Sequence, residues 1–280
     1  MAMAAAMKDS LVCNRIISIK HSADGESSGV KMPKVSYSLG GYKRIRHRNI
    51  VFAASATNQP VLQDSLKRAV AKKAMELIKP GMVVGLGTGS TASMAIEELG
   101  KLIQQGKLKN VIGVGATYQS RVLARQFGVK TVDLNDVNHI DIALDGADEV
   151  DSSMNVLKGG GAAHTMGKVE VLPQAISPVL RKLVSLGGVP EIRNALRKDG
   201  PVITDLGNMV VDVSFPEGIK DPASLEQKIN LIPGVIENGL LTGVASSVLV
   251  ATQDGDDITV IELDEFVKSL KSLSEENSKS

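Results

Sequence analysis

The sequence predicts an α/β fold in which a doubly wound, mostly parallel, Rossmann-like sheet carries a small inserted α+β domain of ferredoxin-like type. Between residues 62 and 144, short apolar strands alternate with amphipathic helical patterns. This alternation indicates a parallel sheet with helices on both faces. After residue 161 the order changes to strand, helix, strand, strand, helix, strand, which is typical of a ferredoxin-like module.

Apolar spacing predicts the individual elements. In the first part we expect helices at residues 66–78, 91–105 and 119–127 and strands at residues 82–86, 111–114, 131–134 and 140–144. In the second part we expect helices at residues 177–186 and 223–231 and strands at residues 169–172, 201–213 (interrupted by a turn at 205–208) and 235–241. A closing hairpin of residues 248–252 and 258–263 precedes a short C-terminal helix.

The N-terminal segment differs in composition from the rest of the chain. Residues 1–52 contain nine Lys and Arg against three acidic residues, and they are rich in Ser without the apolar stretch of a secretory signal. These features are typical of an organelle transit peptide, and a disordered basic arm that binds a polyanion is the alternative. We therefore expect a disordered transit peptide at 1–53, a Rossmann-like substrate-binding domain at 54–168 plus 245–280, and a small α+β domain at 169–244.

Composition excludes several classes of protein. The 280 residues are 43% hydrophobic and 22% charged, as in globular proteins, and no apolar run approaches the roughly 20 residues that cross a bilayer. A net charge of +1, with no Trp, three Tyr and four Phe, gives little with which to bind nucleic acid. Cys13 is the single cysteine, which excludes a disulfide framework and a cysteine-based zinc site.

A glycine-rich segment at residues 85–91 follows a predicted strand and precedes a predicted helix. Glycine allows close approach of the backbone to a ligand, and the N–H groups at a helix N-terminus attract anions. The segment lacks the lysine of a Walker A loop, while a dinucleotide-binding turn and a purely structural turn remain alternatives. The predicted phosphate-binding residues are Gly87, Thr88, Gly89, Ser90 and Thr91.

An acidic segment at residues 145–151 follows the predicted strand 140–144. Ligands of open α/β sheets bind at the carboxyl ends of the strands, so carboxylates there could exchange protons, hold sugar hydroxyls or bind Mg²⁺. A solvated acidic turn is the alternative. The candidate residues are Asp145, Gly146, Ala147 and Asp148.

A third segment, residues 158–163, begins with a lysine and three glycines. Backbone N–H groups and a lysine ammonium together stabilise a developing negative charge, whereas a flexible linker is the alternative. The candidate residues are Lys158, Gly159, Gly160 and Gly161. With the phosphate loop and the carboxylates, they suggest proton transfer next to the carbonyl of a small phosphorylated sugar, through an enediolate.

These three segments, in this order, closely resemble ribose-5-phosphate isomerase type A, and the basic N-terminus makes the match closest to plant plastid members. The resemblance covers about residues 62–263. It implies a metal-free and cofactor-free aldose–ketose isomerase that interconverts ribose 5-phosphate and ribulose 5-phosphate, a step of the pentose phosphate pathway and the Calvin cycle. It also implies a homodimer or homotetramer in the chloroplast stroma, with a sugar phosphate rather than a nucleic acid or a membrane as its partner.

The resemblance also implies residue roles. Residues 88–91 would bind the phosphate, with Lys67 assisting, and Thr117 would offer a further hydroxyl. Asp145 and Asp148 would contact the sugar hydroxyls, Asp145 also helping to open the ring. Lys158 and the N–H groups of residues 159–161 would stabilise the enediolate.

The chain departs from the family pattern after the glycine run. The family's general base falls on Gly167, and a helix and a sheet strand with an active-site lysine are missing between Lys168 and Val169, as a skipped exon would leave. We expect the loss to expose apolar sheet and unpaired backbone groups. His164 is a candidate replacement base, whereas Glu170 is expected to belong to the small domain. A catalytically impaired sugar-phosphate-binding relative is therefore the alternative to an active isomerase, and a dinucleotide-binding protein is a remote one.

Overall fold

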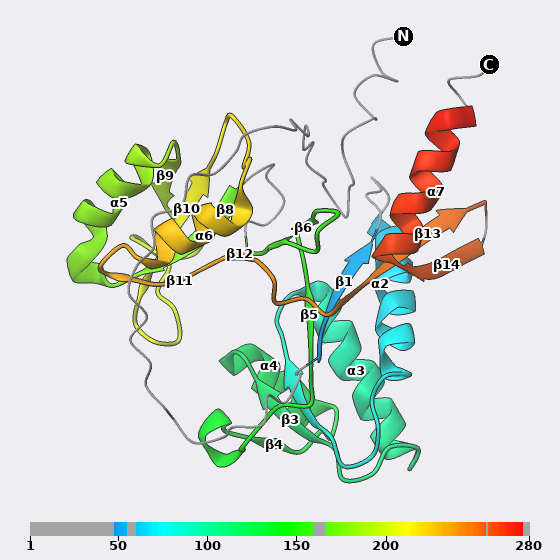
Figure 1. Cartoon of the computed structure of the whole chain (residues 1–280). Helices are drawn as coiled ribbons and strands as arrows, with labels where there is room; N and C mark the ends of the chain where they lie inside the picture. Colours follow the sequence, from blue (N-terminus) through cyan, green and yellow to red (C-terminus); the bar gives the residue numbers. More distant parts are fainter. Residues whose placement is uncertain (1–47, 55–59, 160–165, 256, 277–280) are drawn as a thin grey trace, which may run out of the picture.

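The computed structural model describes residues 48–54, 60–159, 166–255 and 257–276. Figure 1 shows a large α/β domain beside a smaller module built from α5, α6 and β8 to β11. The large domain contains helices α2 (Pro60–Met75), α3 (Ser90–Gln104), α4 (Tyr118–Gln126) and α7 (Leu263–Glu276). Its strands are β1 (Arg48–Ala54), β2 (Val83–Leu86), β3 (Ile112–Gly115), β4 (Thr131–Val132), β5 (Ile142–Gly146), β13 (Ser247–Asp254) and β14 (Asp257–Glu262).

The large sheet has seven strands in the order β14-β13-β1-β5-β2-β3-β4. Its neighbouring strands pair in parallel, except for the antiparallel β13–β14 hairpin. This arrangement confirms the predicted mostly parallel, doubly wound sheet and the predicted hairpin.

Strand β1 corrects the prediction of a disordered segment at residues 1–53 for residues 48–53 alone. Its residues lie between β5 and β13, with Ile50 opposite Leu144 on one side and Ser247 on the other. Parallel pairing on both sides makes β1 an interior strand, so the sheet has no open edge at this point. Residues 1–47 lie outside the described residues, and the transit peptide stays a prediction for them.

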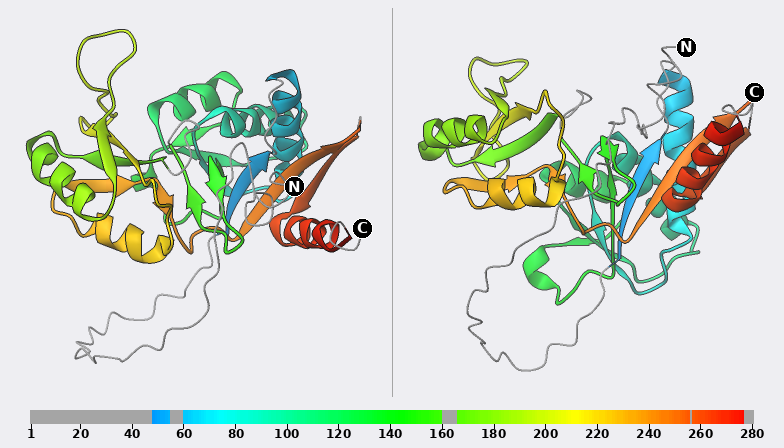
Figure 2. Two further views of the ribbon diagram at one scale, coloured as in Figure 1. Left: turned by 90° about the horizontal axis from the view of Figure 1, so that it is seen from above. Right: turned by 45° about the horizontal axis from the view of Figure 1, so that its top comes forward.

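Side-chain alternation along β1 explains how the sheet is covered. Ile50 belongs to the core that the sheet forms with α2 and α3, whereas Val51 belongs to a second core that includes Leu263 at the start of α7. The views in Figure 2 show α2 and α7 on opposite sides of the strands. The sheet is therefore buried on both faces, as parallel sheets require.

The smaller module runs from β8 (Met166–Val171) through α5 (Ile176–Ser185), β9 (Val189–Ile192), β10 (Met209–Ser214) and α6 (Pro222–Asn230) to β11 (Val235–Asn238). Its antiparallel sheet has the order β11-β8-β10-β9. With this connectivity the module has the predicted ferredoxin-like topology. Valines on one face of β8 and β10 pack with Val179 and Leu183 of α5 and Ile229 of α6.

Two details of the module differ from expectation. The second strand is β9, whereas the predicted strand at residues 201–204 contributes isolated bridges at Pro201 and Ile203. Strand β9 contains Pro190 and pairs with β10 alone. Proline has no backbone N–H, and an edge strand tolerates it because the missing N–H would point away from the sheet.

A third, three-stranded sheet joins the two parts of the molecule. Its strands are β6 (Glu149–Val150), β7 (Val156–Leu157) and β12 (Leu240–Leu241), in the order β12-β7-β6. Because β7 directly precedes Lys158 and β12 directly follows Gly239, this sheet brings the third predicted segment between the large domain and the module.

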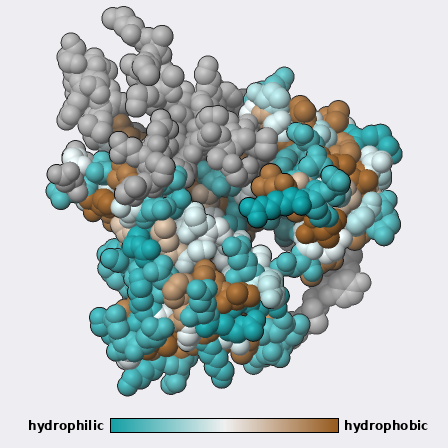
Figure 3. All heavy atoms as spheres, turned by 180° about the vertical axis from the view of Figure 1, so that it is seen from behind, coloured by the Kyte–Doolittle hydropathy of each residue, from teal (hydrophilic) through white to brown (hydrophobic). Residues whose placement is uncertain are grey.

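The surface is mixed in polarity. On the face seen in Figure 3, apolar residues form separate groups among hydrophilic ones. In the described part of the chain, none of the helices combines the length and apolarity needed to cross a membrane.

Candidate active site

The first two predicted segments meet where the order of the large sheet reverses. Strand β2 pairs with β3 on one side and with β5 on the other, so β2 and β5 form the topological switch point at which open α/β sheets bind ligands. Residues 87–91 follow the carboxyl end of β2, and residues 145–148 lie at the carboxyl end of β5. The Gly87 N–H donates to the Leu144 carbonyl over 3.0 Å, and this hydrogen bond joins the two segments.

Gly87 is required by this close approach. A Cβ atom at Gly87 would lie 2.3 Å from the Asp145 carboxyl carbon and 2.7 Å from the Leu144 carbonyl oxygen. No ordinary side chain tolerates such distances without moving the backbone. Glycine here allows the Asp145 carboxylate to lie against the loop of residues 87–91.

Asp145 is held by three donors. Its Oδ1 accepts from the Gly146 N–H at 2.8 Å and the Thr88 N–H at 3.2 Å, and it lies 2.9 Å from Lys158 Nζ. These contacts come from β5, from the loop after β2 and from the residue after β7. The carboxylate is therefore fixed as an acceptor at the switch point.

Lys158 connects the third segment to the first two. Besides Asp145, its ammonium donates to the Thr88 carbonyl at 3.0 Å and to the Gly146 carbonyl at 3.1 Å, and its side chain is 20% exposed. An ammonium that is mostly buried yet reachable from solvent can stabilise negative charge on a ligand at this edge.

The α3 N-terminus lies at the same edge. Its N-cap is Gly89, with a φ of 101°, a conformation that glycine adopts without strain. Because Gly89 has no side chain, it cannot occupy the N–H groups of the first turn. Ser90 is exposed and Thr91 is half-buried, and Thr91 lies beside Gly146. The segment thus has the form of an anion-binding helix start.

Asp148 and Ala147 complete the acidic segment. The Asp148 N–H donates to the Leu157 carbonyl over 2.9 Å, so the half-buried Asp148 lies beside the strand that leads to Lys158. Ala147 packs against the core beneath α7. The structure therefore brings residues 87–91, 145–148 and 158–159 together, whereas Gly160, Gly161 and His164 lie outside the described residues.

Thr117 has a structural task at the neighbouring strand end. It is the N-cap of α4, where its Oγ1 accepts from the Ser120 N–H at 3.3 Å and Ser120 Oγ in turn accepts from the Thr117 N–H at 3.1 Å. The adjacent Tyr118 N–H donates to Asp205 Oδ2 over 2.8 Å. Asp205 belongs to the module, so this contact joins the α4 N-terminus to the smaller part of the molecule.

Lys67, Gly167 and Glu170 have other settings. Lys67 is buried on α2. Gly167 is buried in β8, where a Cβ would point toward Leu157 at 3.4 Å, so this position does not present a base to the site. Glu170 accepts from Thr204 Oγ1 at 2.7 Å and Asn208 Nδ2 at 2.8 Å, which confirms that it belongs to the module.

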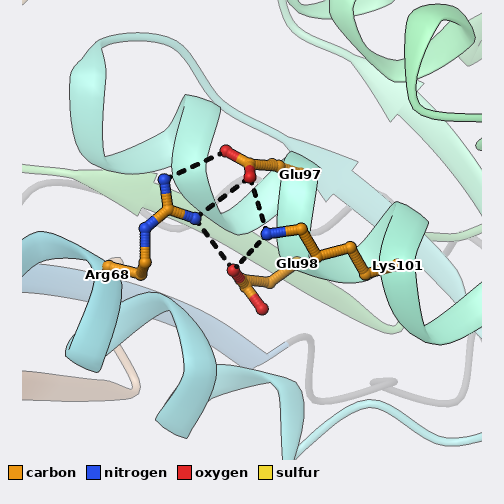
Figure 4. Close-up of polar contacts among 4 residues, drawn as sticks. All are labelled: Arg68, Glu97, Glu98 and Lys101. Atoms are coloured by element: carbon orange, nitrogen blue, oxygen red, sulfur yellow. Dashed lines mark hydrogen bonds and ion pairs between the residues drawn. The ribbon is translucent and has the colours of Figure 1, made fainter.

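A cluster of four charged residues outside the site joins α2 to α3 (Figure 4). Arg68 lies 3.1 Å from Glu97 and 2.9 Å from Glu98, and Lys101 approaches the same two carboxylates at 2.6 and 3.0 Å. Hydrogen bonds from Lys101 and then Arg68 lower the pKa of Glu97 below its usual range. Because all four groups are satisfied by one another, we assign the cluster to helix packing.

Sequence reasoning missed Arg193, Asp212 and Gly239, which contact the segment that begins at Lys158. Arg193 donates to the Gly159 carbonyl at 2.6 Å, and the Lys158 N–H donates to the Gly239 carbonyl at 2.8 Å. No local pattern marks these residues, because they approach the site only through the fold of the module. Within the described residues, no three His, Cys, Asp or Glu side chains gather as a metal site would require.

A sequence model of the family described as ribose 5-phosphate isomerase A (phosphoriboisomerase A) matches residues 112–169 and 168–255. The chain belongs to the ribose-5-phosphate isomerase A family. The two matched segments meet at residues 168–169, the position at which we placed the missing block.

Curated relatives of this family cover most of the folded chain. A ribose-5-phosphate isomerase A from Thermosynechococcus vestitus is 48% identical over 214 residues, which are 66% of this chain and 90% of that protein. One from Synechococcus sp. (strain ATCC 27144) is 46% identical over 226 residues, or 70% of this chain and 97% of the relative. The family assignment replaces the dinucleotide-binding alternative.

Solved structures agree with the fold. Ribose 5-phosphate isomerase A from Methanocaldococcus jannaschii is 40% identical, with a TM-score of 0.64 over 71% of this chain and 99% of that one. A D-ribose-5-phosphate isomerase in complex with phospho-erythronic acid is 36% identical, with a TM-score of 0.67 over 71% and 98%. The second neighbour thus holds a phosphorylated four-carbon acid.

Proposed function

We propose that this protein interconverts ribose 5-phosphate and ribulose 5-phosphate through an enediolate. One observation carries the proposal: the Lys158 ammonium lies 2.9 Å from Asp145 at the switch point of the sheet, beside the start of α3. A cation, a carboxylate and an anion-binding helix start are the groups that an aldose–ketose isomerisation of a sugar phosphate needs without a metal. Family membership supports the same reaction.

In this proposal the substrate phosphate binds the N–H groups and hydroxyls of residues 88–91. The phosphate carries two negative charges near neutral pH, and the first turn of α3 offers unpaired donors and the positive end of the helix dipole. Binding the phosphate there extends the sugar toward Asp145, Asp148 and Lys158.

The carbonyl end of the sugar then meets the rim formed by β5 and β7. Removal of the C2 proton from the aldose places negative charge on the oxygen at C1, and Lys158 stabilises that charge. Returning a proton to C1, with transfer of the C2 hydroxyl proton to the oxygen at C1, completes the ketose. Since Gly167 supplies no base, we assign the proton transfers to the carboxylates of Asp145 and Asp148, which are the acidic side chains at this edge among the described residues.

Steady-state isomerisation of ribose 5-phosphate by the purified chain tests the proposal. We expect Lys158→Met to lower kcat/KM by about 10² to 10³, the usual effect of removing one charge-stabilising donor, and Asp148→Asn to lower kcat strongly. The matched control is Lys182→Met, at an exposed position on α5, which should leave the rate unchanged. Equal rates in the wild type and Lys158→Met would contradict an enzymatic role, and an inactive wild type that still binds ribose 5-phosphate would identify the impaired relative.

We further propose that the leader targets the chain to the chloroplast stroma and is removed before Arg48. The basic, Ser-rich composition of residues 1–47 supports targeting, and the interior position of β1 in the sheet supports a cut ahead of it. Import into isolated chloroplasts, followed by N-terminal sequencing of the product, tests both parts. A mature N-terminus beyond Arg48 would contradict the second.

Self-association is a further part of the proposal. Val184 on α5 and Val189 at the β9 edge are 59% and 57% exposed, and both lie on the smaller module. A contiguous apolar patch favours burial against another chain, and these two valines are our candidates for part of one. Light scattering on the eluting protein should give the mass of a dimer or tetramer, whereas a monomer mass at micromolar concentration would contradict it.

A further inference from the structure

The segment of Lys158 and Gly159 is fixed by two different parts of the molecule. The Lys158 side chain reaches into the large domain, where it binds Asp145 and two backbone carbonyls. Its main chain is attached to the module: the Lys158 N–H donates to the Gly239 carbonyl at 2.8 Å, and the Gly239 N–H donates to the Lys168 carbonyl at 2.8 Å. The position of the ammonium therefore depends on how the module holds the backbone behind it.

Gly159 is the flexible point of this segment. Its φ is +89°, a conformation in which glycine has many neighbouring alternatives. A Cβ at this position would lie 2.5 Å from Cδ of Lys168, a flexible side chain that can move, so the positive φ is what favours glycine here. A hydrogen bond to the Gly159 carbonyl restricts this conformational freedom.

Arg193 supplies that contact. The residue directly follows β9, and its Nη2 donates to the Gly159 carbonyl at 2.6 Å. The guanidinium is itself held by Asp212 on β10, whose two carboxylate oxygens lie 3.1 and 2.9 Å from Arg193 Nε, with a further contact from Nη2. The Arg193 and Asp212 side chains are 32% and 19% exposed. A planar guanidinium can bind a carboxylate with one edge and a carbonyl with another, whereas a lysine ammonium cannot keep both.

We propose that Arg193, oriented by Asp212, is a positioning residue that fixes the Gly159 carbonyl and thereby holds the Lys158 ammonium at the substrate edge. The inference rests on the proposed isomerase function. It makes the smaller module part of the catalytic apparatus, although Arg193 acts through Lys158. The phosphate and the sugar hydroxyls bind other elements, so loss of Arg193 should slow turnover more than it weakens binding.

Two substitutions at Arg193, Arg193→Lys and Arg193→Ala, test the inference in the full chain. Displacing a catalytic group slightly costs up to about 100-fold in rate, so we expect kcat to fall by about 10- to 100-fold. The KM for ribose 5-phosphate should stay within about twofold, and millimolar guanidinium should restore part of the kcat of Arg193→Ala. Arg181→Ala, at an exposed position on α5, is the matched control and should change none of these values.

Amide hydrogen exchange gives a measurement that does not depend on turnover. We expect the Lys158 amide to exchange at least about tenfold faster in Arg193→Lys, while the Val169 and Val171 amides of β8 keep their protection. An unchanged kcat in both variants would overturn the inference. A fall in kcat without guanidinium rescue, together with loss of protection throughout β8, would overturn it by showing a purely structural role. If the wild type lacks isomerase activity, the proposed function fails, and an unchanged Lys158 exchange rate would separately refute the positioning role.

Discussion

The two main sheets of this protein are assembled in opposite ways. The four-stranded sheet of the module uses one continuous stretch, from Met166 to Asn238. The seven-stranded sheet combines β1, the strands between Val83 and Gly146, and the hairpin at residues 247–262. Contacts between distant residues cost more chain entropy than local ones. The large sheet can therefore form only when segments far apart in the sequence come together, whereas the sheet of the module needs only neighbouring segments.

Strand β1 is where this difference is sharpest. Ile50 and Val51 are 3% and 7% exposed and face opposite cores. The strand also pairs on both edges. Losing it would divide the sheet between β5 and β13, beside the switch point that holds Asp145.

Removing β1 is therefore expected to have the largest effect. A chain that begins at residue 55 should lose the cooperative unfolding of the large domain, because burial of each large apolar side chain contributes about 1.5–3 kcal/mol against a total stability of about 5–15 kcal/mol. Hydrogen exchange should show lost protection in β5 and β13 and retained protection in β8 and β10. A chain that begins at Arg48 is the control. Equal melting temperatures for the two chains would refute the difference between the sheets.

Substituting Gly87 tests the large domain at the site itself. Gly87→Ala should destabilise the protein by about 1–3 kcal/mol, as overpacking does, and should displace Asp145 from Lys158 with loss of activity. Gly167→Ala in β8 is the matched control, because its Cβ would meet Leu157 at an ordinary 3.4 Å. Chemical denaturation of both variants measures the effect, and similar stability losses would contradict our account of Gly87.

The ion cluster between α2 and α3 should give the smallest effect. Because hydrogen bonds from Lys101 and Arg68 lower the folded-state pKa of Glu97 below its ordinary 4.5, its contribution is complete above that pH and is lost as the pH falls through the folded-state value. Arg68 and Lys101 are 38% and 44% exposed, so solvent limits the contribution to about 0.5–1 kcal/mol.

Glu97→Gln should therefore lower the melting temperature slightly at pH 7 and should have a smaller effect at pH 3. Thermal unfolding at both pH values measures this, with Glu217→Gln, a substitution at an exposed position between β10 and α6, as the control. A larger effect of Glu97→Gln at pH 3 than at pH 7 would contradict the assigned direction of the pKa change.

Sequence patterns were sufficient where structure is local. The helical spacing that predicts residues 91–105 corresponds to α3, and the apolar runs at residues 82–86 and 140–144 correspond to β2 and β5. Glycines before a helix and carboxylates after a strand predicted which loops meet, because parallel strands bring their carboxyl ends to one edge. The meeting of Asp145 with residues 87–91 was predicted in this way.

The missed features are non-local or short. Strand β1 has an apolar run at Ile50 and Val51, but its composition resembles a leader and its partners lie far along the chain. Strands β6, β7 and β12 contain two residues each, too few for any period to appear. Arg193 reaches Gly159 only because the hairpin of β9 and β10 turns it there, and no spacing in the sequence encodes that approach.

The interior position of β1 also affects the order in which the two sheets can form during synthesis. It is the first strand of the large sheet to be synthesised, yet its neighbour β13 ends at Asp254, so both edges of β1 can be paired only after about 200 further residues have been added. The four strands of the module all lie before residue 239, so the smaller sheet can form before the large one is complete.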